Sequence, residues 1–245
     1  MRALALSLFL LALPGMMLAQ DTDLELVLLA DASGSIDSRE IAFQRQGYAM
    51  ALTDPEVLEA IKGTAYGTIA VTYVEWAQDT AVVVPWTRID GLQAAEGFAS
   101  RLLATPRRAS GRNAIGRALL EGLRQIEEND IQGWRRVIDF SGDSANNHAG
   151  PAIAEARAQV LAAGITINAL PILRPDDPGR AHGGLEALYE ERIIGGMGAF
   201  VVTAESRASF ASAVKRKLVL EISGQMPGAP QVAELAPKKH HPTTE

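Results

Sequence analysis

The chain has 245 residues, 47% of them hydrophobic and 21% charged, with no cysteine and a formal net charge of −6 at pH 7. This length and composition suit one α/β domain with a sizeable core, exclude a chain that is disordered throughout, and exclude stabilisation by disulfides. Because the net charge is negative and the basic residues are dispersed along the sequence, nucleic acid is not expected as a partner.

The first 19 residues have the pattern of a secretory signal peptide. Arg2 precedes a stretch over residues 3–13 that is apolar apart from Ser7, and Ala19 is the small residue expected at a cleavage point. This stretch is too short to span a bilayer comfortably, and no later stretch is long and apolar enough to do so. Since there is no cysteine to carry a lipid anchor, we expect a soluble periplasmic or secreted protein, without stable membrane insertion after cleavage.

A buried strand followed by a polar loop comes next in the chain. Residues 26–30 are a short apolar run, typical of a strand covered on both faces of a parallel sheet. The run ends in Asp31, Ser33 and Ser35, with Gly34 between the two serines. A carboxylate and two hydroxyls on a tight loop beyond a strand end can bind a hard cation such as Mg²⁺, although the same residue types also cap helices.

The rest of the chain alternates between strand and helix patterns. Helices are expected over 39–52 with Ser38 as the cap, and over 54–61, 89–103, 113–129, 153–163, 185–194 and 206–222; strands are expected over 68–77, 81–85, 135–141, 165–173 and 199–203. The strands over 68–77 and 81–85 are close enough to pair as a hairpin. We therefore predict a three-layer, doubly wound α/β fold, whose mostly parallel sheet has one antiparallel edge strand.

The sequence Asp31-Ala32-Ser33-Gly34-Ser35 resembles the DxSxS element of von Willebrand factor A (vWA) domains. Further stretches, which span most of the mature chain, are similar to a bacterial family of exported vWA-like proteins of unknown function, of the DUF1194 type. These stretches are 43–57, 69–77, 82–87, 135–147, 163–173 and 193–202. The resemblance implies a vWA, Rossmann-like fold in which Asp31, Ser33 and Ser35 supply three ligands of a metal-ion-dependent adhesion site (MIDAS).

The resemblance also implies metal ligands on two further loops. Residues 110–119 are similar to the TAIGxAL run of the family, but Asn113 stands where the threonine ligand is expected. An asparagine oxygen can coordinate a hard cation, so Asn113 is a candidate ligand, and a plain helix cap is its alternative. Ser110 is the nearest hydroxyl that could substitute for it. The last carboxylate is expected from Asp143, which could instead be a simple turn residue.

Asp139, inside the strand over 135–141, is a weaker candidate for that last carboxylate. A lone carboxylate buried within a strand would need a partner. The three arginines of the loop over 105–112 could steer an acidic partner, or could simply be solvated. They are Arg107, Arg108 and Arg112.

The leading functional hypothesis is an exported binding module without enzymatic activity. Two aspartates and several hydroxyls would leave a site that is nearly neutral once Mg²⁺, Mn²⁺ or Ca²⁺ is bound. Such a metal can accept a carboxylate from a partner protein, which is the adhesion mechanism that the vWA resemblance implies. The oxygen ligands argue against zinc or copper. The predicted organisation is a signal peptide over 1–19, a vWA-like domain over 20–224 and a flexible tail over 225–245.

Two alternatives remain open from the sequence. The first is a degenerate vWA scaffold that holds no metal, which the departure at Asn113 allows. The second is a serine hydrolase, because Gly142-Asp143-Ser144 matches the GDS core of SGNH esterases, with Ser144 as the nucleophile. The usual late DxxH pair is missing, since Asp177 and His182 have the wrong spacing, and His148 is a speculative base.

Overall fold

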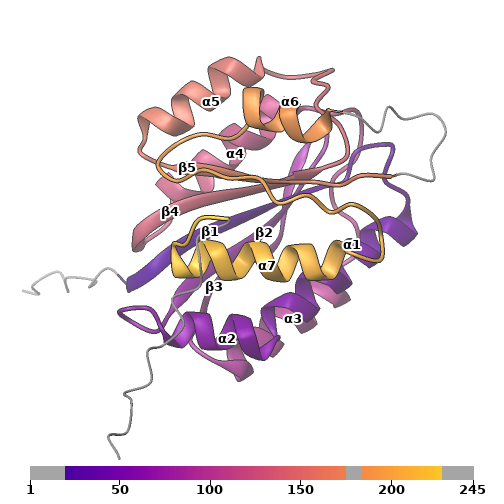
Figure 1. Cartoon of the computed structure of the whole chain (residues 1–245). Coiled ribbons are helices and arrows are strands. Elements are labelled where there is room, and N and C mark those ends of the chain that lie inside the picture. Colours follow the sequence, from indigo (N-terminus) through magenta and orange to yellow (C-terminus); the bar gives the residue numbers. More distant parts are fainter. Residues whose placement is uncertain (1–19, 175–183, 228–245) are drawn as a thin grey trace, which may run out of the picture.

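A five-stranded sheet lies at the centre of the molecule, between two layers of helices (Figure 1). A computed structural model describes residues 20–174 and 184–227 of the chain. The strands are β1 (Gln20–Asp31), β2 (Ile69–Trp76), β3 (Thr80–Ile89), β4 (Ile131–Gly142) and β5 (Thr166–Pro171), in the spatial order β3-β2-β1-β4-β5. β3 pairs with β2 in the antiparallel sense, and the other pairs are parallel. The predicted three-layer, mostly parallel fold with one antiparallel edge strand is therefore confirmed.

The helices divide into one group on each face of the sheet (Figure 1). One face is covered by α1 (Ser38–Leu52), α2 (Pro55–Lys62), α3 (Leu92–Ala104) and α7 (Phe210–Ser223); the other is covered by α4 (Ile115–Glu127), α5 (Ile153–Ala162) and α6 (Leu185–Arg192). Among the described residues, no helix is both long and apolar enough to cross a membrane.

The central strand β1 is buried on both faces, as its apolar run predicts. Leu26 and Leu28 pack with α1, α2, α3 and α7, whereas Val27 and Leu29 pack with α4, α5 and α6. All four are fully buried. Complete burial of such a side chain contributes about 1.5–3 kcal/mol, so this strand anchors two cores at once.

The start of α1 differs from the prediction of Ser38 as its cap. Asp37 is the cap, because its carboxylate accepts hydrogen bonds from the N–H groups of Arg39 and Glu40. The Glu40 carboxylate in turn accepts from the Asp37 N–H at 3.0 Å, which completes a capping box. Asp37, two residues after Ser35, thus ends the polar loop and caps α1.

The predicted strand over 199–203 is wrong, because the segment forms only isolated bridges beside β5. Ala169 bridges Val201, and Ile172 bridges Ala204, both in the parallel sense. Between them lies Pro171, which has no N–H to donate to this neighbour. The Pro171 carbonyl still accepts from the Ala204 N–H at 2.9 Å, so the ladder continues past Pro171 but lacks the hydrogen bond that an N–H at this position would donate.

Several predictions from the sequence lie outside the described residues. They include the signal peptide over 1–19, most of the loop over 175–184 and, within the predicted tail, residues 228–245.

A buried charge cluster joins the sheet to α7. Asp139 of β4 is 1% exposed, and the fully buried Lys217 lies 2.8 Å from its carboxylate. Lys217 also pairs with Glu221, which accepts a hydrogen bond from Asn168 at 3.0 Å. Asp139 therefore has the partner that burial requires. One cation faces two carboxylates here, and burial raises the pKa of Glu221 to about 7 against the opposing attraction of Lys217.

The substitution Glu221→Gln should reduce the dependence of stability on pH. With its pKa raised by burial from 4.5 to about 7, this carboxyl binds a proton more tightly in the folded state. Its contribution to stability is complete below pH 4.5 and is lost as the pH rises to about 7. Relative to wild type, the variant should gain about 3 kcal/mol in free energy of unfolding between about pH 4.5 and about pH 8, measured by urea unfolding.

Lys217→Met provides the comparison within the same cluster. It leaves two buried carboxylates without a cation and should lower the free energy of unfolding by about 3–5 kcal/mol. If Glu221→Gln instead followed the wild type at every pH, Glu221 would not be the carboxyl that holds the extra proton.

Candidate metal-binding site

The two candidate aspartates lie at neighbouring strand ends. β1 and β4 pair in parallel with Ala30 opposite Ser141, so Asp31 and Asp143 emerge at the same edge of the sheet. The Asp143 N–H donates to Asp31 Oδ2 at 3.4 Å. Asp31 is fully buried, and the side chain of Asp143 is 2% exposed. Both carboxylates are therefore largely removed from water.

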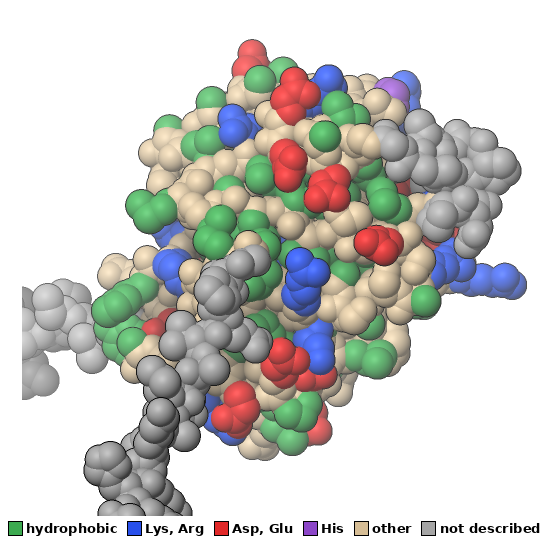
Figure 2. Space-filling view, viewed as in Figure 1, with side chains coloured by type: hydrophobic (Ala, Val, Ile, Leu, Met, Phe, Trp, Pro, Cys, Tyr) green, Lys and Arg blue, Asp and Glu red, His purple; other side chains and the backbone are tan. Residues whose placement is uncertain are grey.

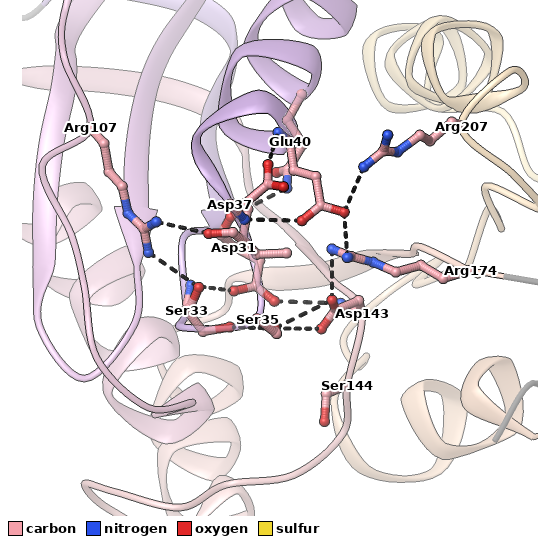
Figure 3. Close-up of polar contacts among 12 residues, drawn as sticks. Asp31, Ser33, Ser35, Asp37, Glu40, Arg107, Asp143, Ser144, Arg174 and Arg207 are labelled. Carbon is pink, nitrogen blue, oxygen red and sulfur yellow. Dashed lines mark hydrogen bonds and ion pairs between the residues drawn. The ribbon is translucent and has the colours of Figure 1, made fainter. Parts of the chain in front are cut away.

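The two motif serines complete a set of converging oxygens (Figure 3). Asp31 Oδ1 accepts from the Ser33 N–H at 2.8 Å, which folds the loop back over its own carboxylate. Ser33 Oγ and Ser35 Oγ lie 3.1 Å apart, and Ser35 Oγ is 3.5 Å from both carboxylate oxygens of Asp143. The structure thus brings together Asp31, Ser33, Ser35 and Asp143, from two loops far apart in the sequence.

The fifth candidate, Asn113, belongs to a loop that is hydrogen-bonded to each of the two loops that carry the other candidates. Its backbone carbonyl accepts from the N–H groups of His148 at 2.8 Å and Ala149 at 3.1 Å. The nearby Gly111 carbonyl accepts from the Gly34 N–H at 2.8 Å. Within the described part of the chain, no hydrogen bond joins the Asn113 side chain to the four converging residues. Its role as a ligand stays a prediction.

Arg107 holds the motif loop in place by binding its backbone. Its guanidinium donates to the carbonyls of Ile36 at 2.8 Å and Ser33 at 3.2 Å, and also to that of Ala32. Arg107 is half-buried. It is therefore neither a solvated surface residue nor a free charge that could steer a partner, and the sequence analysis missed its structural role. Arg112, by contrast, is exposed.

A buried ion pair fixes the loop that carries Arg107. Arg45 of α1 and Glu75 of β2 lie 2.6 Å apart, with side chains 5% and 1% exposed. Arg45 also donates to the carbonyls of Thr105 and Pro106, the latter at 3.2 Å. The other oxygen of Glu75 accepts from the Arg108 N–H at 2.7 Å. The order of the motif loop therefore depends on a charge pair buried beneath it.

The electrostatics of the site suit a hard divalent cation. Burial, with the neighbouring Asp143 charge as a second cause, raises the pKa of Asp31 to about 7. Two buried carboxylates and two hydroxyls are an all-oxygen donor set, as Mg²⁺, Mn²⁺ and Ca²⁺ prefer. Among the described residues, no group of three or more His, Cys, Asp or Glu side chains is arranged to hold a metal. A cation here would therefore rely on the serine hydroxyls as well as the carboxylates.

Arg174, which the sequence analysis did not single out, contacts the last carboxylate of the site (Figure 3). Its Nη2 lies 2.8 Å from Asp143 Oδ2, and its other terminal nitrogen pairs with Glu40 Oε1. Arg207 Nη2 lies 2.9 Å from the same Glu40 oxygen. Arg174 comes three residues after β5, at the sheet edge where β1 and β4 also end. That position was the one signal in the sequence that could have identified it.

Comparison with known proteins identifies a family and a fold. A family model described as "Protein of unknown function (DUF1194)" matches residues 21–226. No curated protein matches the sequence significantly. Proximal thread matrix protein 1 (PTMP1) from the mussel byssus has a similar structure, with a TM-score of 0.57 and 17% identity, over 84% of this chain and 49% of that one. A second PTMP1 structure, with a zinc-occupied MIDAS motif, matches at a TM-score of 0.53 and 15% identity, over 84% of this chain and 49% of that one.

Two bacterial structures are similar to the same extent. A von Willebrand factor type A protein from Catenulispora acidiphila matches with a TM-score of 0.57 and 14% identity, over 82% of this chain and 43% of that one. The pilus adhesin SpaC from Lactobacillus rhamnosus GG matches with a TM-score of 0.58 and 14% identity, over 83% and 31%. The chain thus spans about half or less of these proteins. At such identities the likeness shows the vWA fold alone.

The substitution Arg107→Gln should destabilise the protein through the motif loop. It withdraws the guanidinium from backbone carbonyls of that loop, and each buried carbonyl left without a donor costs about 1–3 kcal/mol. We expect a loss of about 2–3 kcal/mol in the free energy of unfolding, measured with urea. Arg112→Gln removes the same charge from an exposed position of the same loop and should change stability by less than about 0.5 kcal/mol. Equal effects of the two substitutions would show that Arg107 does not hold the loop.

Proposed function

The chain belongs to the DUF1194 family of proteins of unknown function, and we propose that it is a binding module that engages a partner protein through a divalent cation. The observation that carries the proposal is the convergence of Asp31, Ser33, Ser35 and Asp143 beyond the ends of two adjacent parallel strands. Ligands of open α/β sheets bind at this edge.

Each residue of the site has a definite part in this proposal. The carboxylates of Asp31 and Asp143 supply the negative charge, the hydroxyls of Ser33 and Ser35 supply neutral oxygens, and Asn113 supplies an amide oxygen from the third loop. Bound Mg²⁺, Mn²⁺ or Ca²⁺ would offer a coordination position to a carboxylate of the partner. Because only two of these five side chains carry charge, the loaded site would stay attractive to an acidic group.

The comparisons support the same kind of role. SpaC is a pilus adhesin, and PTMP1, a matrix protein, has been solved with zinc in its MIDAS motif. By analogy we propose that this chain also works outside the cytoplasm, in the periplasm or the medium. Residues 1–19 would be its signal peptide, 20–224 its vWA-like domain and 225–245 its tail.

The charge distribution also fits a protein partner better than nucleic acid. On the face drawn in Figure 2, Lys and Arg side chains are scattered among Asp and Glu, without a continuous basic patch. The chain as a whole carries a net charge of −6. A phosphate backbone is bound chiefly by clustered Lys and Arg, which this face does not present.

The surroundings of Ser144 support binding rather than ester hydrolysis. Its hydroxyl oxygen accepts from the Asn146 N–H at 3.1 Å, and its carbonyl accepts from the Tyr189 hydroxyl at 3.1 Å. The first of these contacts is typical of a polar turn. Asp177 and His182, two of the other residues considered for hydrolysis, lie outside the described residues. We therefore propose that Gly142-Asp143-Ser144 is a ligand loop and not a nucleophile motif.

Titration with Mg²⁺ and Mn²⁺ by calorimetry tests the proposed cation. Asp31→Asn and Asp143→Asn keep the shape of each side chain but remove one of two formal charges. Each should weaken binding by about tenfold or more. The control Asp90→Asn removes an exposed carboxylate outside the site and should bind as the wild type does. Absence of binding to the wild type in a folded, metal-free preparation would contradict the proposal and favour the degenerate scaffold.

Substitutions at position 113 test the third loop separately. If the amide oxygen is a ligand, Asn113→Ala should weaken cation binding by about tenfold, because a coordinating atom is lost. Asn113→Thr, which installs the hydroxyl expected from the vWA resemblance, should retain binding. Equal affinities for wild type and Asn113→Ala would remove Asn113 from the ligand set and leave the proposed cation site otherwise intact.

A further inference from the structure

Arg174 forms an ion pair with the buried Asp143 carboxylate. Its guanidinium lies 2.8 Å from Asp143 Oδ2, and the Asp143 side chain is only 2% exposed, whereas that of Arg174 is 17% exposed. The same carboxylate is a proposed ligand, so a guanidinium and a divalent cation would compete for its charge. A cation that enters between Asp31 and Asp143 therefore has to weaken the contact of Asp143 with Arg174.

Glu40 gives the displaced guanidinium a place to remain. One oxygen of Glu40 accepts from the Asp37 N–H at 3.0 Å as part of the capping box, so this carboxylate is fixed to the start of α1. The other oxygen already pairs with Arg174, and with Arg207 at 2.9 Å. Arg174 can thus release Asp143 and keep an ion pair, since one of its two carboxylate partners is independent of the metal site.

We infer that Arg174 is a built-in competing cation, which neutralises Asp143 when the site holds no metal and moves fully onto Glu40 when a divalent cation binds. This inference rests on the proposed function, because it assigns a regulator to the same site. It implies that the cation affinity of the wild type is set below what the oxygen ligands alone would give. A carboxylate of the partner protein would then contact the bound cation while Arg174 is paired with Glu40.

The test compares Arg174→Gln with Arg207→Gln by calorimetric titration with Mg²⁺ and Mn²⁺. Both substitutions remove one positive charge next to Glu40, but only the first removes a contact with Asp143. We expect Arg174→Gln to bind the cation about tenfold more tightly than wild type, the change that follows from losing one charge-assisted competitor. Arg207→Gln should stay within about threefold of the wild type.

Thermal unfolding of the same proteins gives a second readout. Without metal, Arg174→Gln should unfold at a lower temperature than wild type, because Asp143 loses its ion pair with Arg174. With saturating Mg²⁺ it should show a larger upward shift than wild type, because stabilisation by a ligand grows with affinity. A residue with a purely structural role would lower the unfolding temperature in both conditions and would not raise the affinity.

The outcomes separate this inference from the proposed function. Unchanged or weaker cation binding in Arg174→Gln, with measurable binding to wild type, overturns the inference alone. Equal tightening in Arg174→Gln and Arg207→Gln also overturns it, because general charge and not contact would then be the cause. Absence of cation binding in wild type and both variants overturns both. Binding that is detectable only in Arg174→Gln supports competition by Arg174 but contradicts the proposed function, since the wild type would then hold no cation.

Discussion

Because β1 pairs with β4 in parallel, two carboxylates of like charge lie next to each other in a buried position. Asp31 ends one strand and Asp143 follows the other, and the backbone N–H of the second contacts the side chain of the first. Two unit charges about 4 Å apart repel by about 4 kcal/mol at the effective dielectric constant usual near a protein surface. Burial of the Asp31 carboxylate is the larger cause of its raised pKa, and this repulsion is the second; together they raise it to about 7. The basic residues around the site order its loops and balance part of its charge.

Three arginines near the site either order its loops or balance its charge. Arg45 pairs with Glu75 below the site and orders the loop over 105–109, and Arg107 of that loop binds the carbonyls of the motif loop. These two fix the backbone without touching either aspartate. Of these three arginines, Arg174 is the one that contacts a site carboxylate. Positional order and charge balance are therefore supplied by separate residues, so that a change in one need not disturb the other.

The sequence alone was sufficient for those features that depend on neighbouring residues. The apolar run of β1, the oxygen-rich loop after it and the strand–helix alternation are local patterns, and they predict the fold class and the candidate ligands Asp31, Ser33 and Ser35. Asn113 and Asp143 became candidates only through the resemblance to vWA domains. Long-range contacts were not accessible. Arg107 lies 71 to 75 positions from the carbonyls it binds on the motif loop, and Arg174 meets Asp143 only through the order of the strands. Pro171 is visible in the sequence, but its effect depends on which segment lies beside β5.

Two clusters in this molecule each place two buried carboxylates near one basic side chain. The differences between the clusters indicate different roles. Between β4 and α7, Asp139 and Glu221 share Lys217, whose side chain is fully buried and held within a helix. At the sheet edge, Asp31 and Asp143 have Arg174, which is 17% exposed, follows a strand end and has a second carboxylate partner in Glu40. A cation locked in the core can only stabilise the fold. A cation at the surface with an alternative partner can leave, and it is at this second cluster that two hydroxyls also converge. Of the two clusters, it is therefore the one at the sheet edge, with the proposed ligands, where a divalent cation could replace the basic side chain.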